Sequence, residues 1–267
     1  MKTVVITGSA KGFGFECAKV FRENNYNVVL SDINKERLGE AKTKLEKIKA
    51  KAKVLAVPCD VTKNEDLVNL WKVAVDEFRV VDIFINNAGV NQRDANFYEL
   101  SEDEIEFLLK VDLIGTMLGS KLAFEKMREQ GFGQIYNIEG YGSNDAMMPK
   151  LTLYGTSKRA VTYFTQALAK ESQALTKGAV KVNRLTPGIM ITDFITSANG
   201  GKTAIELDEK TKKIYNILGD YPETIAKYVV PRIIKNNKNN AKIVWLSNGR
   251  AFRKFLSYVF HKRDYFN

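Results

Sequence analysis

The chain has 267 residues, of which 45% are hydrophobic, so it can bury the core of one large α/β domain or of two small ones. Its two cysteines, Cys17 and Cys59, are too few for a disulfide framework, and its single histidine, His261, argues against a histidine-based triad or metal site. We therefore predict reduced thiols, no metal and a cytoplasmic protein. No secretion signal precedes the first apolar run.

The net charge of +10 would suit nucleic acid or an anionic surface, but its distribution favours a simpler interpretation. Many lysines lie in Lys35–Lys53, where Leu38, Ala41 and Leu45 form an apolar stripe at helical spacing. The lysines then occupy the solvated faces of that helix. We predict no nucleic-acid partner.

Short apolar runs alternate along the chain with longer amphipathic stretches, a pattern typical of a parallel sheet with helices on both faces. The pattern predicts seven strands, at Thr3–Thr7, Asn27–Ser31, Lys53–Val57, Val81–Asn86, Gln134–Ile138, Lys181–Leu185 and Lys242–Leu246. It predicts connecting helices at Gly14–Asn24, Lys35–Ala50, Asn64–Phe78, Glu102–Glu129 and Leu153–Thr176. The fold class is therefore α/β, a Rossmann-type doubly wound sheet in a single domain over residues 1–267.

The regular alternation ends after the sixth predicted strand. Residues 189–221 have mixed polarity and contain Gly200 and Gly201, so we expect a substrate-covering insert there. A further helix is predicted at Pro222–Lys235, and residues 249–267 form a basic tail.

The first predicted strand runs into the sequence TGSAKGFG, which places Gly8, Gly12 and Gly14 in the turn that opens the first helix. Glycines let the backbone approach a pyrophosphate closely, and a helix N-terminus presents N–H groups and a positive dipole end to phosphate. The spacing differs from GxGxxG, and the alternative is a turn that uses glycine only for its geometry.

Asp32 falls at the end of the second predicted strand, where a carboxylate can accept both hydroxyls of an adenosine ribose and would repel a 2′-phosphate. Lys11 in the glycine turn is a competing phosphate partner. We predict NAD(H) in preference to NADP(H). The alternative for Asp32 is a helix cap before Asn34–Arg37.

Tyr154 and Lys158 are four residues apart at the start of a predicted helix, so their side chains share one face. A phenol has a pKa of about 10, and a nearby ammonium and the positive nicotinamide ring should together lower the pKa of Tyr154 enough for general acid/base work. The alternative is a solvated tyrosine and lysine pair without chemistry.

Five motifs, taken in chain order, resemble those of one known family. The chain resembles the short-chain dehydrogenase/reductase family at these motifs: TGSAKGFG, CDVT at Cys59–Thr62, NNAG at Asn86–Gly89, YGTSK at Tyr154–Lys158 and PGIMIT at Pro187–Thr192. The resemblance implies hydride exchange between a nicotinamide and a carbonyl or alcohol, with Tyr154 as the proton donor. With the residue arguments above, it gives as cofactor-binding residues Gly8, Ser9, Lys11, Gly12, Phe13, Gly14, Asp32, Asp60, Val61, Asn87, Ala88, Gly89, Tyr154, Lys158, Pro187, Gly188, Ile189 and Thr192.

The chain departs from the family pattern at three positions, in two places. Glu139 and Gly140 stand where the family has serines, so Ser143 is the nearest candidate for the hydroxyl that contacts the substrate oxygen, the alternative being a turn serine. Asp112 stands where the family has an asparagine of the proton relay, and it should raise the pKa of Lys158 if the two are close. The predicted catalytic residues are thus Tyr154, Lys158, Ser143 and Asp112.

The segment EGYGS before YGTSKRAV, and NILGDYPETIAKYVVPRI after it, resemble the chlorophyll(ide) b reductase branch of that family. This likeness supports Ser143 but does not establish a tetrapyrrole substrate. Large apolar residues flank the expected reaction centre and predict a bulky, hydrophobic carbonyl or alcohol: Tyr141, Met147, Met148, Ile189, Phe194 and Ile195. The alternative is a non-catalytic NAD(H)-binding or membrane-associated protein, which the departures at Gly140 and Asp112 would explain.

The tail contains a basic amphipathic helix. Its apolar stripe consists of Phe252, Phe255, Leu256, Val259 and Phe260. Such a helix either lies peripherally on an anionic membrane or packs on its own domain or on a partner subunit. We also expect a homodimer or homotetramer.

Overall fold

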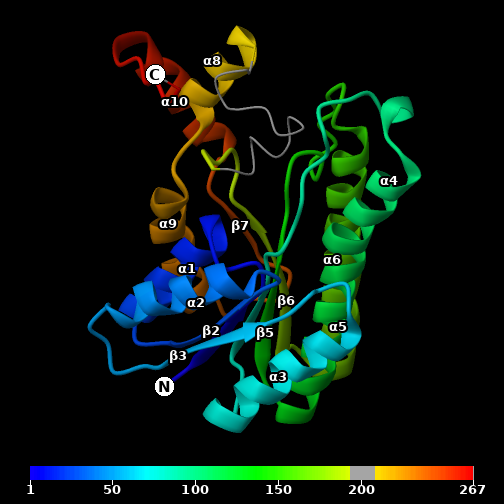
Figure 1. The fold of residues 1–267 in the computed structure, drawn as a ribbon, viewed down its shortest axis with the longest axis vertical. Helices are drawn as coiled ribbons and strands as arrows, with labels where there is room; N and C mark the ends of the chain where they lie inside the picture. The colour runs from blue at the N-terminus through cyan, green and yellow to red at the C-terminus, as the bar shows by residue number, and fades with distance from the viewer. Residues whose placement is uncertain (193–207, 267) are drawn as a thin grey trace.

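The computed structural model describes residues 1–192 and 208–266, which form a seven-stranded sheet in the order β3-β2-β1-β4-β5-β6-β7 (Figure 1). Every neighbouring pair is parallel. The strands are β1 (Thr3–Ile6), β2 (Asn27–Asp32), β3 (Val54–Pro58), β4 (Ile83–Asn86), β5 (Gly133–Ile138), β6 (Val180–Thr186) and β7 (Lys242–Val244). The predicted fold class is confirmed.

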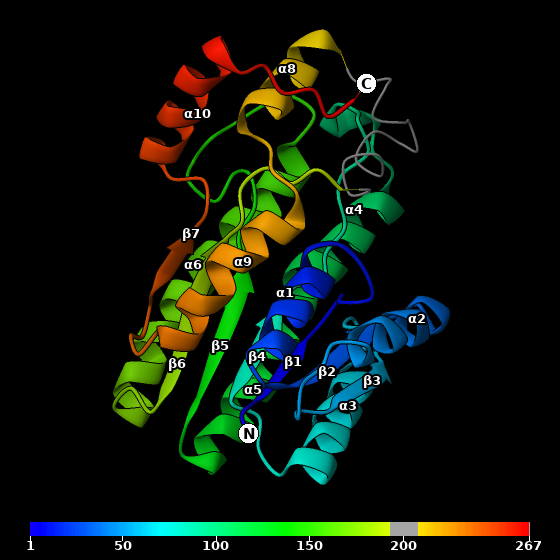
Figure 2. The ribbon, with the colours of Figure 1, turned by 90° about the vertical axis from the view of Figure 1, so that its left-hand side faces the viewer.

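Helices cover both faces of the sheet, as Figure 2 shows. The helices are α1 (Gly12–Glu23), α2 (Lys35–Glu46), α3 (Asn64–Phe78), α4 (Glu102–Leu109), α5 (Thr116–Gln130), α6 (Thr152–Thr176), α8 (Glu209–Leu218), α9 (Pro222–Lys235) and α10 (Asn248–Phe260), with a short 3-10 turn η1 at Phe97–Glu99. One core packs α1, α2 and α9 against the sheet, and a second packs α3, α5 and α6 against the other face. Because both faces are covered, central strands read as continuous apolar runs, and Val4, Val5 and Ile6 are all fully buried.

The single helix predicted at Glu102–Glu129 has a different form. Helix α4 passes into a π-helical segment, η2 (Lys110–Gly115), before α5 begins. A Cβ on Gly115 would lie 2.8 Å from the Val61 side chain, so the π-helical segment passes close to the loop after β3. π-Helical turns occur frequently at functional sites, and this one carries Asp112.

The carboxyl ends of the strands, where ligands bind in open parallel sheets, lie at the end of the molecule that also carries α8 and α10 (Figure 1). Of the predicted insert, the structure describes residues 189–192, where Met190 forms a β-bridge with Asp220, and α8. Residues 193–207, including Phe194 and Ile195, lie outside the described residues. Among the residues described, no helix is both long and apolar enough to cross a membrane.

Candidate functional site

The glycine turn between β1 and α1 leaves room for a ligand at its tip. Gly8 and Gly12 both have φ near +60°, a conformation that side chains rarely adopt. A Cβ on Gly8 would lie 2.6 Å from the Ala88 Cα atom, whereas a Cβ on Gly12 would meet nothing within 4 Å. A Cβ on Gly14 would lie 2.5 Å from Asn87 Nδ2. Gly8 and Gly14 are therefore required for close packing, and Gly12 forms the open part of the turn.

Asp32 lies beside this turn, as the sequence predicts. Its Oδ2 atom accepts a hydrogen bond from the Ala10 N–H at 3.2 Å, and its Oδ1 atom accepts from the Asn34 N–H at 3.0 Å. The cap of α2 is Asn34, whose side chain accepts from the Arg37 N–H, so the helix-cap alternative for Asp32 is not what the structure shows.

Two further residues of the glycine turn build the loop. The Ser9 hydroxyl is buried, donates to the Ile6 carbonyl at 2.7 Å and accepts from the Ser31 N–H at 3.0 Å. Phe13 is 5% exposed and packs in the core. Lys11, at the N-cap of α1, is exposed.

The loop after β4 crosses over the glycine turn. Asn87 Nδ2 donates to the carbonyls of Thr7 and Gly8 at 2.9 and 2.8 Å, and the Thr7 hydroxyl accepts from the N–H groups of Asn87 and Ala88. A Cβ on Gly89 would lie 3.4 Å from Asp112 Oδ1 and 3.6 Å from Lys158 Nζ. The NNAG motif thus joins the glycine turn to the residues predicted to react.

The remaining predicted contacts lie on loops that follow other strands. Asp60 Oδ1 accepts from the Thr62 N–H and hydroxyl, and Val61 is buried against η2. Pro187, Gly188, Ile189 and Thr192 follow β6. The Ile189 carbonyl accepts from the Asp220 N–H at 3.2 Å, which ties this loop to the segment before α9.

Tyr154, Lys158 and Asp112 form a buried cluster at the start of α6. Lys158 Nζ lies 2.8 Å from Asp112 Oδ2, with the two side chains 7% and 0% exposed. It also lies 5.4 Å from the centroid of the Tyr154 ring. Asp112 Oδ1 accepts from the Val90 N–H at 2.7 Å, which fixes the carboxylate. The structure therefore brings together three of the four predicted catalytic residues.

The acidity of this cluster corrects one prediction. Burial raises the pKa of Tyr154 to about 12. The Lys158 ammonium lowers this pKa, but the Asp112 carboxylate opposes the effect of the ammonium. Burial by itself would lower the pKa of Lys158, but Asp112 and Tyr154 together raise it above its ordinary value. The predicted net fall in the pKa of Tyr154 does not occur in the protein alone, although Lys158 acts in the predicted direction. The predicted rise for Lys158 is confirmed.

Gly140 and Ser143 form a tight turn beside Tyr154. The Ser143 hydroxyl donates to the Gly140 carbonyl, and the Gly140 N–H donates to Ser143 Oγ at 3.0 Å. A Cβ on Gly140 would lie 2.4 Å from the Tyr154 hydroxyl oxygen. The tyrosine hydroxyl thus lies where a serine side chain at residue 140 would begin, and the contacts of Ser143 are those of the turn-serine alternative.

Gln92 is a positioning residue that sequence reasoning missed. Its Oε1 atom accepts from the N–H groups of Leu153 and Tyr154 at 2.9 and 3.2 Å. Helix α6 has no side-chain cap from its own N-cap residue, Leu151, so Gln92 satisfies N–H groups that the helix start leaves unpaired. Because Gln92 is remote in sequence, no local pattern indicates this cap.

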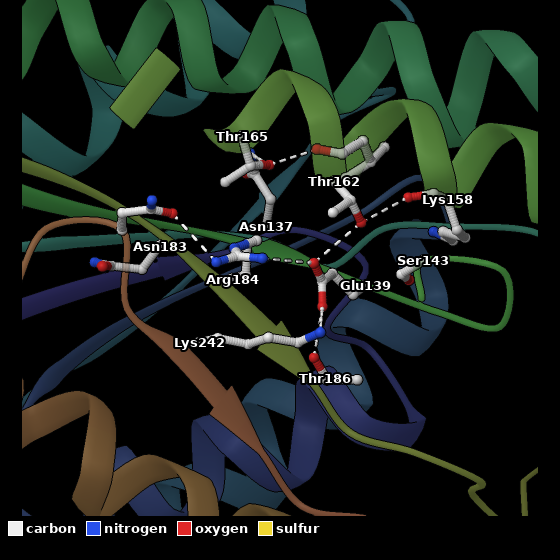
Figure 3. Close-up of polar contacts among 12 residues, drawn as sticks. Asn137, Glu139, Ser143, Lys158, Thr162, Thr165, Asn183, Arg184, Thr186 and Lys242 are labelled. Atoms are coloured by element: carbon white, nitrogen blue, oxygen red, sulfur yellow. Dashed lines mark hydrogen bonds and ion pairs between the residues drawn. The ribbon is translucent and has the colours of Figure 1, made fainter. Parts of the chain in front are cut away.

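Glu139 is the second missed feature, and Figure 3 shows its side chain among residues from β6, β7 and α6. The buried carboxylate accepts from the hydroxyls of Thr162 and Thr186 at 3.0 and 2.7 Å. It also lies 3.7 Å from Arg184 Nη1 and 3.1 Å from Lys242 Nζ. The charge that replaces a family serine is therefore matched by two cations, and Thr162 lies one turn along α6 from Lys158.

Replacing Glu139 by leucine is expected to lower the free energy of unfolding by about 3 kcal/mol, because Arg184 would keep a largely buried, unmatched charge. Lys242 is 34% exposed and can turn to water, which keeps the loss near the lower end of the usual range. Urea unfolding measures this effect. Adding Arg184→Met should recover part of the loss, and a double variant less stable than Glu139→Leu would contradict this account.

The comparisons with known proteins agree with this geometry. A family model described as short chain dehydrogenase matches residues 2–203. Chlorophyll(ide) b reductase NOL of Oryza sativa subsp. japonica is 34% identical over 232 residues, covering 86% of this chain and 66% of that protein. Probable chlorophyll(ide) b reductase NYC1 of Arabidopsis thaliana is 31% identical over 282 residues, covering 94% of this chain and 54% of that protein. The chain therefore spans only part of the length of these relatives.

Solved structures share the fold at lower identity. Levodione reductase superposes with a TM-score of 0.81 at 22% identity, covering 94% of this chain and 98% of that one. The alcohol dehydrogenase of Thermococcus sibiricus superposes with a TM-score of 0.75 at 23% identity, covering 92% and 96%. The family model matches well over half of the chain, and the motif order and the site geometry agree with it. The chain belongs to the short-chain dehydrogenase/reductase family of NAD(P)-dependent oxidoreductases.

Proposed function

We propose that this protein interconverts a carbonyl and an alcohol on a bulky, hydrophobic substrate, with Tyr154 as the general acid/base. The observation that carries the proposal is the buried cluster of Tyr154, Lys158 and Asp112 at the carboxyl end of the sheet, next to Gly89 of the nucleotide loops. A tyrosine and lysine on a solvated helix, the alternative at the sequence level, would not be buried together.

The residues of the nucleotide loops fit a dinucleotide. Gly12 leaves open space at the helix N-terminus, and the Asp32 carboxylate lies at the end of the neighbouring strand. When bound, a nicotinamide cofactor supplies the hydride acceptor or donor. Pro187, Gly188, Ile189 and Thr192 would line its nicotinamide end.

The protein's own residues would handle the proton. With a raised pKa, Tyr154 keeps its hydroxyl proton at neutral pH and is suited to donate it to a substrate oxygen, which is the reductive direction. The Lys158 ammonium faces the ring, and Asp112 holds the ammonium in place. Ser143 would be the second hydroxyl at the site, once its donor leaves the Gly140 carbonyl for the substrate oxygen.

The substrate class rests on the loop that leads from Gly140 to Tyr154. Met147 is 91% exposed, and Met148 and Tyr141 are 49% and 40% exposed on the loop between β5 and α6. The two curated relatives are named for reductases of chlorophyll(ide) b, which is also a bulky molecule. Initial rates with NADH on aldehydes and ketones of increasing size test the proposal. Faster turnover of small polar carbonyls than of bulky apolar ones would contradict it.

We expect NADH to bind more tightly than NADPH, because the Asp32 carboxylate would repel a 2′-phosphate. Titration by nucleotide fluorescence measures both affinities. Asp32→Asn keeps the acceptor for the Ala10 N–H but removes the charge, so it should shift the preference towards NADPH by roughly tenfold. One fold relative was solved with 5-hydroxy-NADP, and tighter NADPH binding by the unaltered chain would sink the argument from Asp32.

Assembly into a homodimer or homotetramer belongs to the same proposal. A groove of about 450 Å³ between α5 and α6 is lined by Leu118, Phe124, Phe164 and Leu168 and rimmed by charged residues. An apolar centre with a charged rim is typical of subunit interfaces. A sedimentation mass of 30.1 kDa, that of one chain, would contradict it.

Three further expectations belong to the proposal. The chain forms a single domain, residues 189–221 cover the substrate, and the protein is cytoplasmic.

A further inference from the structure

Helix α10 is attached to the rest of the protein through its basic residues. The Arg250 guanidinium lies 3.7 Å from the ring centroid of Trp245 and 4.3 Å from that of Tyr228. Lys254, one turn later, pairs with Asp220, which also binds Arg263 beyond the end of the helix. These cations therefore face the body of the protein rather than solvent.

The apolar stripe of α10, which consists of Phe252, Phe255, Leu256, Val259 and Phe260, lies on the outside. Its five members are 64%, 50%, 51%, 71% and 81% exposed, and no residue of α10 is buried. Figure 2 shows α10 beyond the end of β7, at the edge of the molecule. An ordinary surface helix has the reverse orientation, with its apolar stripe on the core. Of the alternatives for this helix, packing on its own domain therefore does not apply to the apolar stripe.

A second copy of the chain is a poor fit for this surface, because two copies face to face would bring basic residues of the helix against one another. Five side chains of this size, each about half exposed or more, present on the order of 500 Å² of apolar area. A single helix face is, by contrast, sufficient for an amphipathic helix to lie in a membrane interface.

Charge decides which surface would receive the stripe. Residues 248–263 contain five basic side chains, Arg250, Arg253, Lys254, Lys262 and Arg263, and no acidic one. Asp220 contacts two of them. Arg253 and Lys262 are exposed on the helix and just beyond its end. Lys210 and Lys213 are exposed on α8, the helix that packs against α10 and that also carries the exposed Glu209. An apolar stripe flanked by cations is complementary to anionic lipid headgroups above an acyl layer.

We propose that the apolar stripe of α10 docks this protein on the surface of an anionic lipid bilayer, without crossing it. The helix follows β7 directly, so it lies at the carboxyl end of the parallel sheet, as do Tyr154 and the loop after β6. Asp220 links the two, because its backbone pairs with Ile189 and Ile191 and its carboxylate binds Lys254. Docking would bring the substrate end of the sheet to the bilayer, a consequence that, unlike docking itself, rests on the proposed function.

Co-sedimentation of the full chain with vesicles tests the proposal. Vesicles of phosphatidylcholine with a third phosphatidylserine are compared with pure phosphatidylcholine. We expect binding to the anionic vesicles that weakens as salt is raised. The variant Phe252→Ser, Phe255→Ser, Phe260→Ser alters only exposed side chains and should reduce the apparent affinity by about tenfold or more. Phe132→Ser, 43% exposed and just before β5 at the opposite end of the sheet, is the matched control and should bind as the unaltered chain does.

Several outcomes would overturn the proposal. Absence of binding to anionic vesicles would do so, as would equal binding to both compositions or equal binding by the triple-serine variant. A fall in sedimentation mass of the triple-serine variant, without vesicle binding by the unaltered chain, would assign the stripe to a second copy. None of these results depends on turnover, so a failure here is distinct from a failure of the proposed reaction.

Discussion

Tyr154→Phe is expected to lower turnover by about 10²- to 10⁴-fold, the usual contribution of a positioned general acid. The substitution removes only the hydroxyl that lies against Gly140, and the ring keeps its place beside Lys158. The nucleotide loops are untouched, so the affinity for NADH should stay within about threefold of its original value. Steady-state kinetics with a carbonyl substrate and a fluorescence titration measure the two quantities.

The matched control is Tyr163→Phe, a tyrosine on the same helix that is 75% exposed, and it should leave turnover unchanged. If the Tyr154→Phe variant turned over as fast as the unaltered chain, Tyr154 would not be the general acid/base. If the unaltered chain binds NADH but reduces no carbonyl, the alternative of a non-catalytic NAD(H)-binding protein is preferred.

Asp112→Asn is expected to move the pH–rate profile to lower pH. The Asp112 carboxylate raises the pKa of Tyr154, so removing its charge favours the phenolate and lowers that pKa. In the oxidative direction the base form of Tyr154 is needed, and the rising limb should begin at lower pH. In the reductive direction the acid form is needed, and the falling limb should also begin at lower pH. Both limbs thus shift the same way.

The same substitution should reduce the free energy of unfolding by up to about 3 kcal/mol at neutral pH, since the buried Lys158 loses its carboxylate partner. Glu106→Gln is the control, because Glu106 pairs with Lys110 on the same stretch of helix but both side chains are well exposed. Its profile should not move. A profile for Asp112→Asn that stays in place, or shifts to higher pH, would show that the carboxylate does not act on Tyr154.

Two differences from the sequence predictions, at Tyr154 and at α10, have a common physical origin in burial. Sequence spacing places Tyr154 and Lys158 on one face of α6, which the structure confirms. Spacing carries no information on solvent access, and it is desolvation together with Asp112 that moves the pKa of Tyr154 upward. Likewise, the amphipathic pattern of α10 is evident in sequence, but which face meets the protein depends on Asp220 and Trp245, which lie outside the helix.

The sequence by itself determined the fold class, the glycine turn, the pairing of Tyr154 with Lys158 and the family. These depend on local signals: apolar runs of strand length, helical spacing, and glycines where the backbone must turn. Only the tertiary structure decided how Asp112 meets Lys158 through the π-helical segment, that Gln92 caps α6, and that Arg184 and Lys242 match the charge of Glu139. Each of these contacts joins residues far apart in the chain, and packing of the whole sheet and its helices brings them within bonding distance.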